Sequence, residues 1–182
     1  MAEIRTAEKV KLIVGMLSSF PGALAAAEGE LVHYYGPVDL RSPVTAHEFT
    51  EYYRDEMGHP LVRYFVSFEQ LIDAARLAEI KAQTNELERR LAEAGEWAAC
   101  RPVNLDPGYI APAKLVLASC KDYAHRIYLG GGIYAETTLG YSEGRWKCYE
   151  WTYPDYRTEQ YQAFLTQVRE RLLAQRKELR TL

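Results

Sequence analysis

The segment from Val10 to Leu17 limits the possible folds more than any other part of this chain of 182 residues. It is short, almost continuously apolar and followed by a Ser-Ser-Phe-Pro-Gly segment, as is typical of a β-strand buried on both faces. The next segment, Ala23 to Tyr35, is rich in alanine, has apolar residues at helical spacing, and precedes Gly36 and Pro37, where a helix should end. The chain therefore begins with a central strand of a sheet and then a helix.

Two further patterns predict the elements that follow, up to residue 95. Polar and apolar residues alternate with period two from Val38 to Phe68, including the run from Phe49 to Glu56, which predicts a hairpin or meander. Ser67 and Gln70 then form a capping-box signature. The apolar residues after them recur at helical spacing and predict a long central helix from Phe68 to Gly95.

The second half of the chain predicts a further hairpin and a closing helix. His125 to Tyr141 alternates around three consecutive glycines, and Arg145 to Trp151 is expected to add a third strand. The last segment carries one apolar helical face, formed by Tyr161, Phe164, Leu165, Val168 and Leu172. We therefore predict a single α+β domain over residues 1–182, with a mixed or mostly antiparallel sheet packed by the long central helix and a C-terminal amphipathic helix.

Composition and charge argue against several classes of protein. The formal net charge is −3, so no global basic field is present to attract nucleic acid, and we expect no nucleic-acid partner. The three cysteines, Cys100, Cys120 and Cys148, are widely spaced, which favours reduced thiols and a cytoplasmic protein. The charged N-terminus and the short apolar run that follows predict neither a signal peptide nor a membrane span.

Several motifs carry a resemblance to a known family. They are Val-Asn-Leu-Asp-Pro-Gly-Tyr (103–109), Leu-Val-Leu-Ala-Ser-Cys-Lys (115–121), His-Arg-Ile-Tyr-Leu (125–129), Gly-Ile-Tyr-Ala-Glu (132–136) and Trp-Thr-Tyr-Pro-Asp-Tyr (151–156). With them the chain resembles a bacterial family known as domain of unknown function 4416, over nearly its whole length. The resemblance implies no established activity. A P-loop GTPase is not predicted, because the chain has no GxxxxGK[ST] motif between a strand and a helix.

The candidate site lies between Arg101 and Tyr141, where ionisable residues are interleaved with strand-like sequence. Asp106 to Tyr109 reads Asp-Pro-Gly-Tyr, which predicts a type II turn able to hold side chains rigidly. Asp106 and His125 are the catalytic candidates, His125 because imidazole titrates near neutral pH. Asp106 and Glu136, with Asp155 as a further carboxylate, are the candidate ligands of Mg²⁺ or Mn²⁺. The candidate ligand-binding residues are Asn104, Tyr109, Lys114, Lys121 and Arg126.

A purely structural interpretation explains the same residues. Asp106 then caps its turn, Glu136 pairs with a lysine or arginine across the sheet, and Asp155 caps the last helix. In a strand His125 and Arg126 point to opposite faces, so both reach one pocket only at a bulge. Cys120 lies in an apolar run and is interpreted as an inert core thiol, and His47 as a surface or loop residue.

Two functions therefore follow from the sequence. In the first, the protein binds or processes a small anionic metabolite, phosphorylated or carboxylated, with a divalent metal as candidate cofactor. In the second, it is a non-catalytic interaction or regulatory module, a homodimer formed through tyrosine-rich strands, because aromatic residues with polar tips are common at interfaces. The chain contains 14 tyrosines. No reaction type follows from either interpretation.

Overall fold

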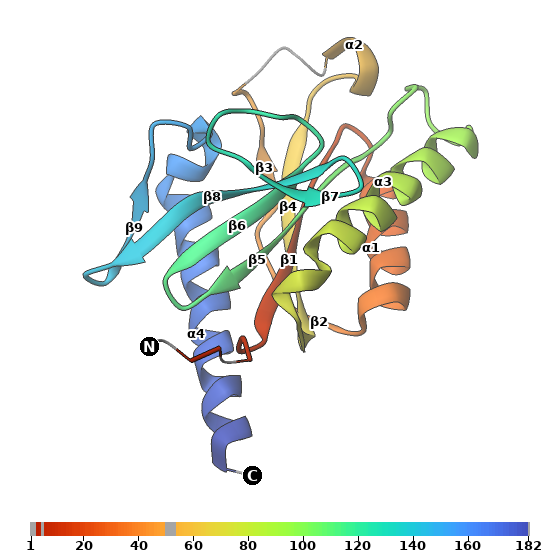
Figure 1. Ribbon diagram of the computed structural model, residues 1–182. Helices are drawn as coiled ribbons and strands as arrows, with labels where there is room; N and C mark the ends of the chain where they lie inside the picture. The colour runs from red at the N-terminus through yellow and green to blue at the C-terminus, as the bar shows by residue number, and fades with distance from the viewer. Residues whose placement is uncertain (1–2, 5, 50–53, 182) are drawn as a thin grey trace.

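Figure 1 shows the computed structural model of the protein, which describes residues 3, 4, 6–49 and 54–181. These residues form one antiparallel sheet of nine strands. The strands are β1 (Val10–Ser18), β2 (Val38–Arg41), β3 (Thr45–Ala46), β4 (Val62–Ile72), β5 (Asn104–Ala111), β6 (Lys114–Ser119), β7 (Ile127–Gly130), β8 (Ile133–Ser142) and β9 (Arg145–Cys148). The helices are α1 (Pro21–Tyr35), α2 (Arg54–Met57), α3 (Leu77–Glu93) and α4 (Glu159–Thr181), with 3₁₀ turns η1 (Ala74–Arg76) and η2 (Pro154–Arg157).

The sheet has the order β2-β4-β1-β5-β6-β8-β7, with β3 also on β4 and β9 also on β8. All nine residues of β1 are buried, because β4 and β5 pair with its two edges and helices cover both faces. Helices α1 and α3 pack on one face, and α4 packs on the other (Figure 1). This arrangement confirms the α+β prediction, the central first strand and the amphipathic C-terminal helix.

The start of the central helix was predicted wrongly. Residues 68–72 continue β4, in which Ile72 pairs with Val10 of β1 and Phe68 pairs with Val38 of β2. The Ser67 hydroxyl donates to a carboxylate oxygen of Asp39 at 2.6 Å and caps no helix. Asp73 provides the cap instead, since its carboxylate accepts from the Ala75 N–H at the start of η1. Strand pairing on both edges here outweighs a local helical pattern.

The Asp-Pro-Gly-Tyr sequence is not a turn. Asp106 to Tyr109 lie inside β5, where Asp106 is opposite Gly15 of β1. Gly108 is required by close packing, because a Cβ there would lie 2.4 Å from the carbonyl oxygen of Val116. Pro107 precedes the residues that pair with β6, so its missing N–H interrupts no bond to that strand.

The second half of the chain agrees with the sequence more closely. Strands β7 and β8 form the predicted hairpin around three glycines that all have positive φ, and β9 adds the predicted third strand. In the earlier alternating run from Phe49 to Glu56, residues 50–53 lie outside the described part, and residues 54–57 form α2 rather than a strand. Among the described residues, no helix is both long and apolar enough to cross a membrane.

Candidate functional site

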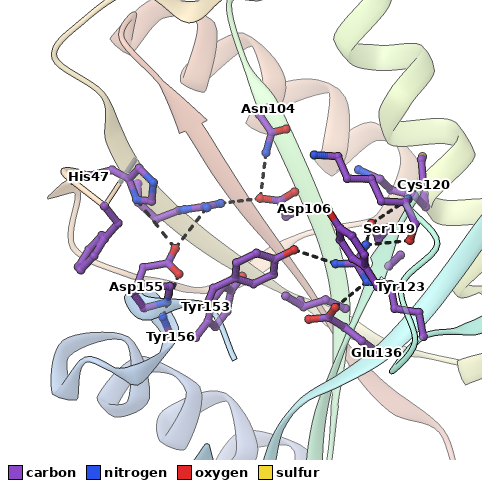
Figure 2. A pocket seen from close by; sticks show the side chains of 18 of the residues that line it. His47, Asn104, Asp106, Ser119, Cys120, Tyr123, Glu136, Tyr153, Asp155 and Tyr156 are labelled. Atoms are coloured by element: carbon purple, nitrogen blue, oxygen red, sulfur yellow. Dashed lines mark hydrogen bonds and ion pairs between the residues drawn. The ribbon is translucent and has the colours of Figure 1, made fainter. Parts of the chain in front are cut away.

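A cavity of about 510 Å³ opens at the end of the sheet where β1 and β6 end and β4 and β5 begin. Figure 2 shows the side chains that line it. They come from β4, α3, β5, β6, β8 and η2, and from the loops that flank them, so segments far apart in the sequence form one site. The lining is strongly charged, with five lysine and arginine side chains and three carboxylates: Arg63, Lys81, Arg101, Lys121, Arg126, Asp106, Glu136 and Asp155.

Arg63 of β4 organises one side of the cavity. Its Nη1 donates to Asp106 Oδ2 at 2.8 Å and its Nη2 to Asp155 Oδ2 at 3.4 Å, so one guanidinium joins two carboxylates (Figure 2). The residue is only 6% exposed. Gly15 of β1 leaves the space, because a Cβ at that position would lie 3.2 Å from Arg63 Nη1 and 2.8 Å from the Phe65 ring. A glycine in the central strand therefore helps to form the cavity wall.

The two carboxylates and the nearby His47 have different protonation preferences. Burial opposes ionisation of Asp106, but the charges of Arg63 and Lys81 outweigh it and lower its pKa. For Asp155 burial dominates and raises the pKa, and Arg63 offsets only part of the effect. Burial, with a smaller contribution from Arg63, lowers the pKa of His47 to about 4, so its imidazole is neutral at neutral pH.

Glu136 of β8 organises the other side of the cavity. Its Oε2 accepts from Arg126 Nε at 2.7 Å and lies 3.1 Å from His125 Nε2. Arg126 also donates to the hydroxyls of Ser119 at 2.6 Å and of Tyr153 at 2.8 Å. In Figure 2 Tyr153 lies between the group around Asp155 and the group around Glu136.

Helix α3 provides a third wall through residues that contact the backbone of β5. Lys81 Nζ donates to the Leu105 carbonyl at 2.8 Å, and Glu88 Oε1 accepts from the Leu105 N–H at 2.7 Å. Glu88 also pairs with Arg101 at 2.9 Å. Lys81 is 6% exposed and forms no ion pair with any described carboxylate. Its charge acts on Asp106 and Glu88 only at longer range, so this buried ammonium, which faces the cavity, has no direct ion-pair partner among the described residues.

The structure brings together six of the nine residues nominated from the sequence. These six line the cavity: Asn104, Asp106, Lys121, Arg126, Glu136 and Asp155. His125 lies beside it and contacts Glu136. Tyr109 packs against apolar residues of the core and does not line the cavity. Lys114 is exposed at the opposite end of β6. The catalytic and ligand-binding roles of these residues remain predictions.

Several local expectations need correction. His125 and Arg126 both reach Glu136 because β7 begins only at Ile127, so the alternation of a strand does not apply to them. Cys120 is exposed and lines the cavity, and is not a core thiol. His47 lies in a loop after β3, which is one of its two expected settings, but it is buried in the cavity wall and is not a surface residue.

The structural interpretation of the carboxylates holds in part. Glu136 pairs with an arginine, as that interpretation expects, although the arginine lies in a turn. The last helix is capped by Thr158, whose hydroxyl accepts from the Tyr161 N–H at 3.4 Å, and not by Asp155. Among the described residues no group of three or more histidine, cysteine or acidic side chains could hold a metal ion. The Mg²⁺ or Mn²⁺ site therefore gains no support from the geometry and stays a prediction.

Sequence reasoning missed Arg63, Lys81, Glu88 and Tyr153. A signal existed for three of them. Lys81 and Glu88 lie seven residues apart on α3 and share a helical face with Thr84. Charged residues on an otherwise buried face are unusual and indicate specific partners. Arg63 lies on the same strand face as Phe65, which is the equivalent signal for β4.

Fold and site together define an α+β protein with a buried, charged cavity at one end of an antiparallel sheet. The chain belongs to the family described as Domain of unknown function (DUF4416), which matches residues 8–172. Comparison with curated proteins and with solved structures gave no match. Evidence about function therefore comes from the cavity itself.

Proposed function

We propose that this protein binds a small organic anion, phosphorylated or carboxylated, in the cavity between α3, β5 and η2. The observation that carries the proposal is the buried ammonium of Lys81, which faces the cavity without a direct ion pair to any described carboxylate. An anionic ligand would give this ammonium a direct ion-pair partner. The excess of lysine and arginine over carboxylates in the lining supports the same conclusion.

Lys11 provides a comparison within the same chain. It is fully buried, but its ammonium forms an ion pair with Asp39 and donates to Gln175 Oε1 at 2.8 Å. This fold therefore pairs a buried lysine with a carboxylate where the lysine only supports the structure. Lys81 differs because it lines a cavity that is large enough for a small metabolite.

A thermal-shift screen tests the proposal. Wild type, Lys81→Met and the control Lys114→Met are compared with inorganic phosphate and with phosphorylated and carboxylated metabolites, each with and without Mg²⁺ or Mn²⁺. A ligand at 100 times its Kd stabilises the native state by about 2.7 kcal/mol, which raises the Tm. We expect a shift in wild type and Lys114→Met that is lost in Lys81→Met. Equal shifts in all three proteins, or no shift in wild type, would refute anion binding at Lys81.

The exposed edge of β7 favours a second candidate, a homodimer. Strand β7 is the last in the sheet order, and its Ile127 is 72% exposed and followed by exposed Tyr128 and Leu129. The strand carries no charged residue of the kind that protects edges from pairing. An edge strand can pair antiparallel with the same strand of a second copy across a twofold axis. A second copy of this chain is therefore the partner proposed for β7.

Sedimentation equilibrium tests this second candidate. We expect wild type to dimerise and Ile127→Lys to be monomeric, since a lysine on the edge opposes strand pairing. Val44→Lys is the matched control because Val44 is also exposed but lies outside β7. A monomeric wild type at high concentration, or a dimer that survives Ile127→Lys, would exclude pairing through β7.

A further inference from the structure

Asp106 presents an unused hydrogen-bond acceptor to the cavity. Both of its protein partners, Arg63 Nη1 at 2.8 Å and Asn104 Nδ2 at 2.9 Å, donate to the same oxygen, Oδ2. No described residue donates to Oδ1, and the side chain is 30% exposed. Asp106 forms an ion pair with Arg63 and is therefore a carboxylate, which only accepts hydrogen bonds. The free oxygen can therefore bind a donor group of a ligand.

Tyr153 presents the complementary donor. Its hydroxyl oxygen accepts from Arg126 Nη2 at 2.8 Å, and a guanidinium has no acceptor, so the tyrosine proton is not used in that bond. No described residue accepts this proton. A tyrosine hydroxyl ordinarily has a pKa of about 10, so it keeps its proton at neutral pH. Asp106 and Tyr153 both line the same cavity (Figure 2).

We infer that the bound anion also carries a hydroxyl group, which donates to Asp106 Oδ1 and accepts from the Tyr153 hydroxyl. This inference rests on the proposed function, because it takes the charged group of the ligand to lie at Lys81. The arrangement suits one small molecule, since Lys81, Asp106 and Tyr153 all line the same cavity of about 510 Å³. The ligand class is then the hydroxylated organic anions, such as polyol phosphates and hydroxy acids.

A hydroxyl fits this pair of groups better than the alternatives. A second anionic group at Asp106 would be repelled by the carboxylate. An ammonium could donate to Asp106 but could not accept from Tyr153, and the neighbouring Arg63 would repel it. A hydroxyl both donates and accepts, so it satisfies the carboxylate and the tyrosine at once. Asp106 and Tyr153 would thus determine specificity beside the anion-binding lysine.

Two matched ligand pairs test the inference. Glycerol 3-phosphate and propyl phosphate share a phosphate monoester and a three-carbon chain and differ only in hydroxyls, as do glycerate and propionate with a carboxylate. Each is titrated by ¹⁵N-HSQC NMR into wild type, Asp106→Asn and the control Glu143→Gln, in which an exposed acid is neutralised outside the cavity. The spectra also show whether each variant is folded.

We expect wild type and Glu143→Gln to bind the hydroxylated member of at least one pair about tenfold more tightly, the effect of a hydrogen bond to a charged group. Asp106→Asn should lose most of this preference and still bind the plain anion at least as tightly, because a repulsive charge has been removed. Equal binding of both members by wild type, or a preference that survives in Asp106→Asn, would overturn the inference and leave anion binding intact. Failure of all four compounds to bind would overturn both.

Discussion

Replacing Arg63 with methionine should cause a large, pH-dependent loss of stability. Arg63 is the cation shared by Asp106 and Asp155, and removing one partner of a buried ion pair costs roughly 3–5 kcal/mol because the remaining charge is uncompensated. The Asp155 side chain is 5% exposed and cannot be rehydrated, whereas Asp106 is 30% exposed and partly can. We therefore expect Arg63→Met to lower the free energy of unfolding by about 3 kcal/mol at neutral pH, near the lower end of that range.

The pH dependence has a definite sign. Without Arg63 the native-state pKa values of both carboxylates rise, Asp155 from a value that burial already raises. A carboxyl group whose pKa is higher in the native state than in the unfolded state lowers the free energy of unfolding when it is ionised in the native state. This destabilisation disappears as the pH falls and the group is protonated. The loss caused by Arg63→Met should therefore be larger at about pH 8 than at about pH 5.

Urea unfolding followed by tryptophan fluorescence measures these differences. Arg89→Met is the control, because Arg89 is exposed and its surface pairs with Glu86 and Glu93 should contribute little to stability. Asp155→Asn added to Arg63→Met should restore part of the stability by removing the unpaired charge. A loss below about 1 kcal/mol, or one independent of pH, would show that Arg63 does not hold these carboxylates.

Two further predictions concern the core and the histidine in the cavity wall. Gly108→Ala should destabilise the protein by roughly 1–3 kcal/mol in urea unfolding, because its Cβ would collide with the Val116 carbonyl. Gly29→Ala in α1, with open space around it, should stabilise it by about 0.5–1 kcal/mol, and equal effects would contradict the packing argument. His47 is neutral in the native state, so stability should fall between about pH 6.5 and about pH 4, by on the order of 3 kcal/mol at most, as the unfolded state takes up its proton. The charges near His47 are Arg63, Asp106 and Asp155, and the raised pKa of Asp155 acts in the opposite direction. His47→Gln should therefore lose less stability than wild type over this range, and parallel pH curves would refute the assignment.

Regular local patterns were sufficient to predict most elements. The apolar run of β1, the apolar face of α4 and the glycine loop between β7 and β8 each reflect burial or turn chemistry within one segment. Where the fold overrode local sequence, the prediction was wrong. Residues 68–72 have helical spacing but pair with two strands, and Asp-Pro-Gly-Tyr has turn chemistry but is held extended by β1.

The cavity was predictable only in part. The sequence itself determined that ionisable residues gather between Arg101 and Tyr141, and five residues nominated in that segment do line the cavity. It did not indicate the partners of Arg63, because Arg63 lies 43 residues from Asp106 and 92 from Asp155 along the chain. Those contacts depend on strand register and on the position of η2 over the sheet. Burial and charge pairing act between residues that are close in space, and these segments share no pattern in the sequence that would reveal the contact. The tertiary structure alone therefore decided which charges are paired and left the ammonium of Lys81 beside the cavity without a direct ion pair to any described carboxylate.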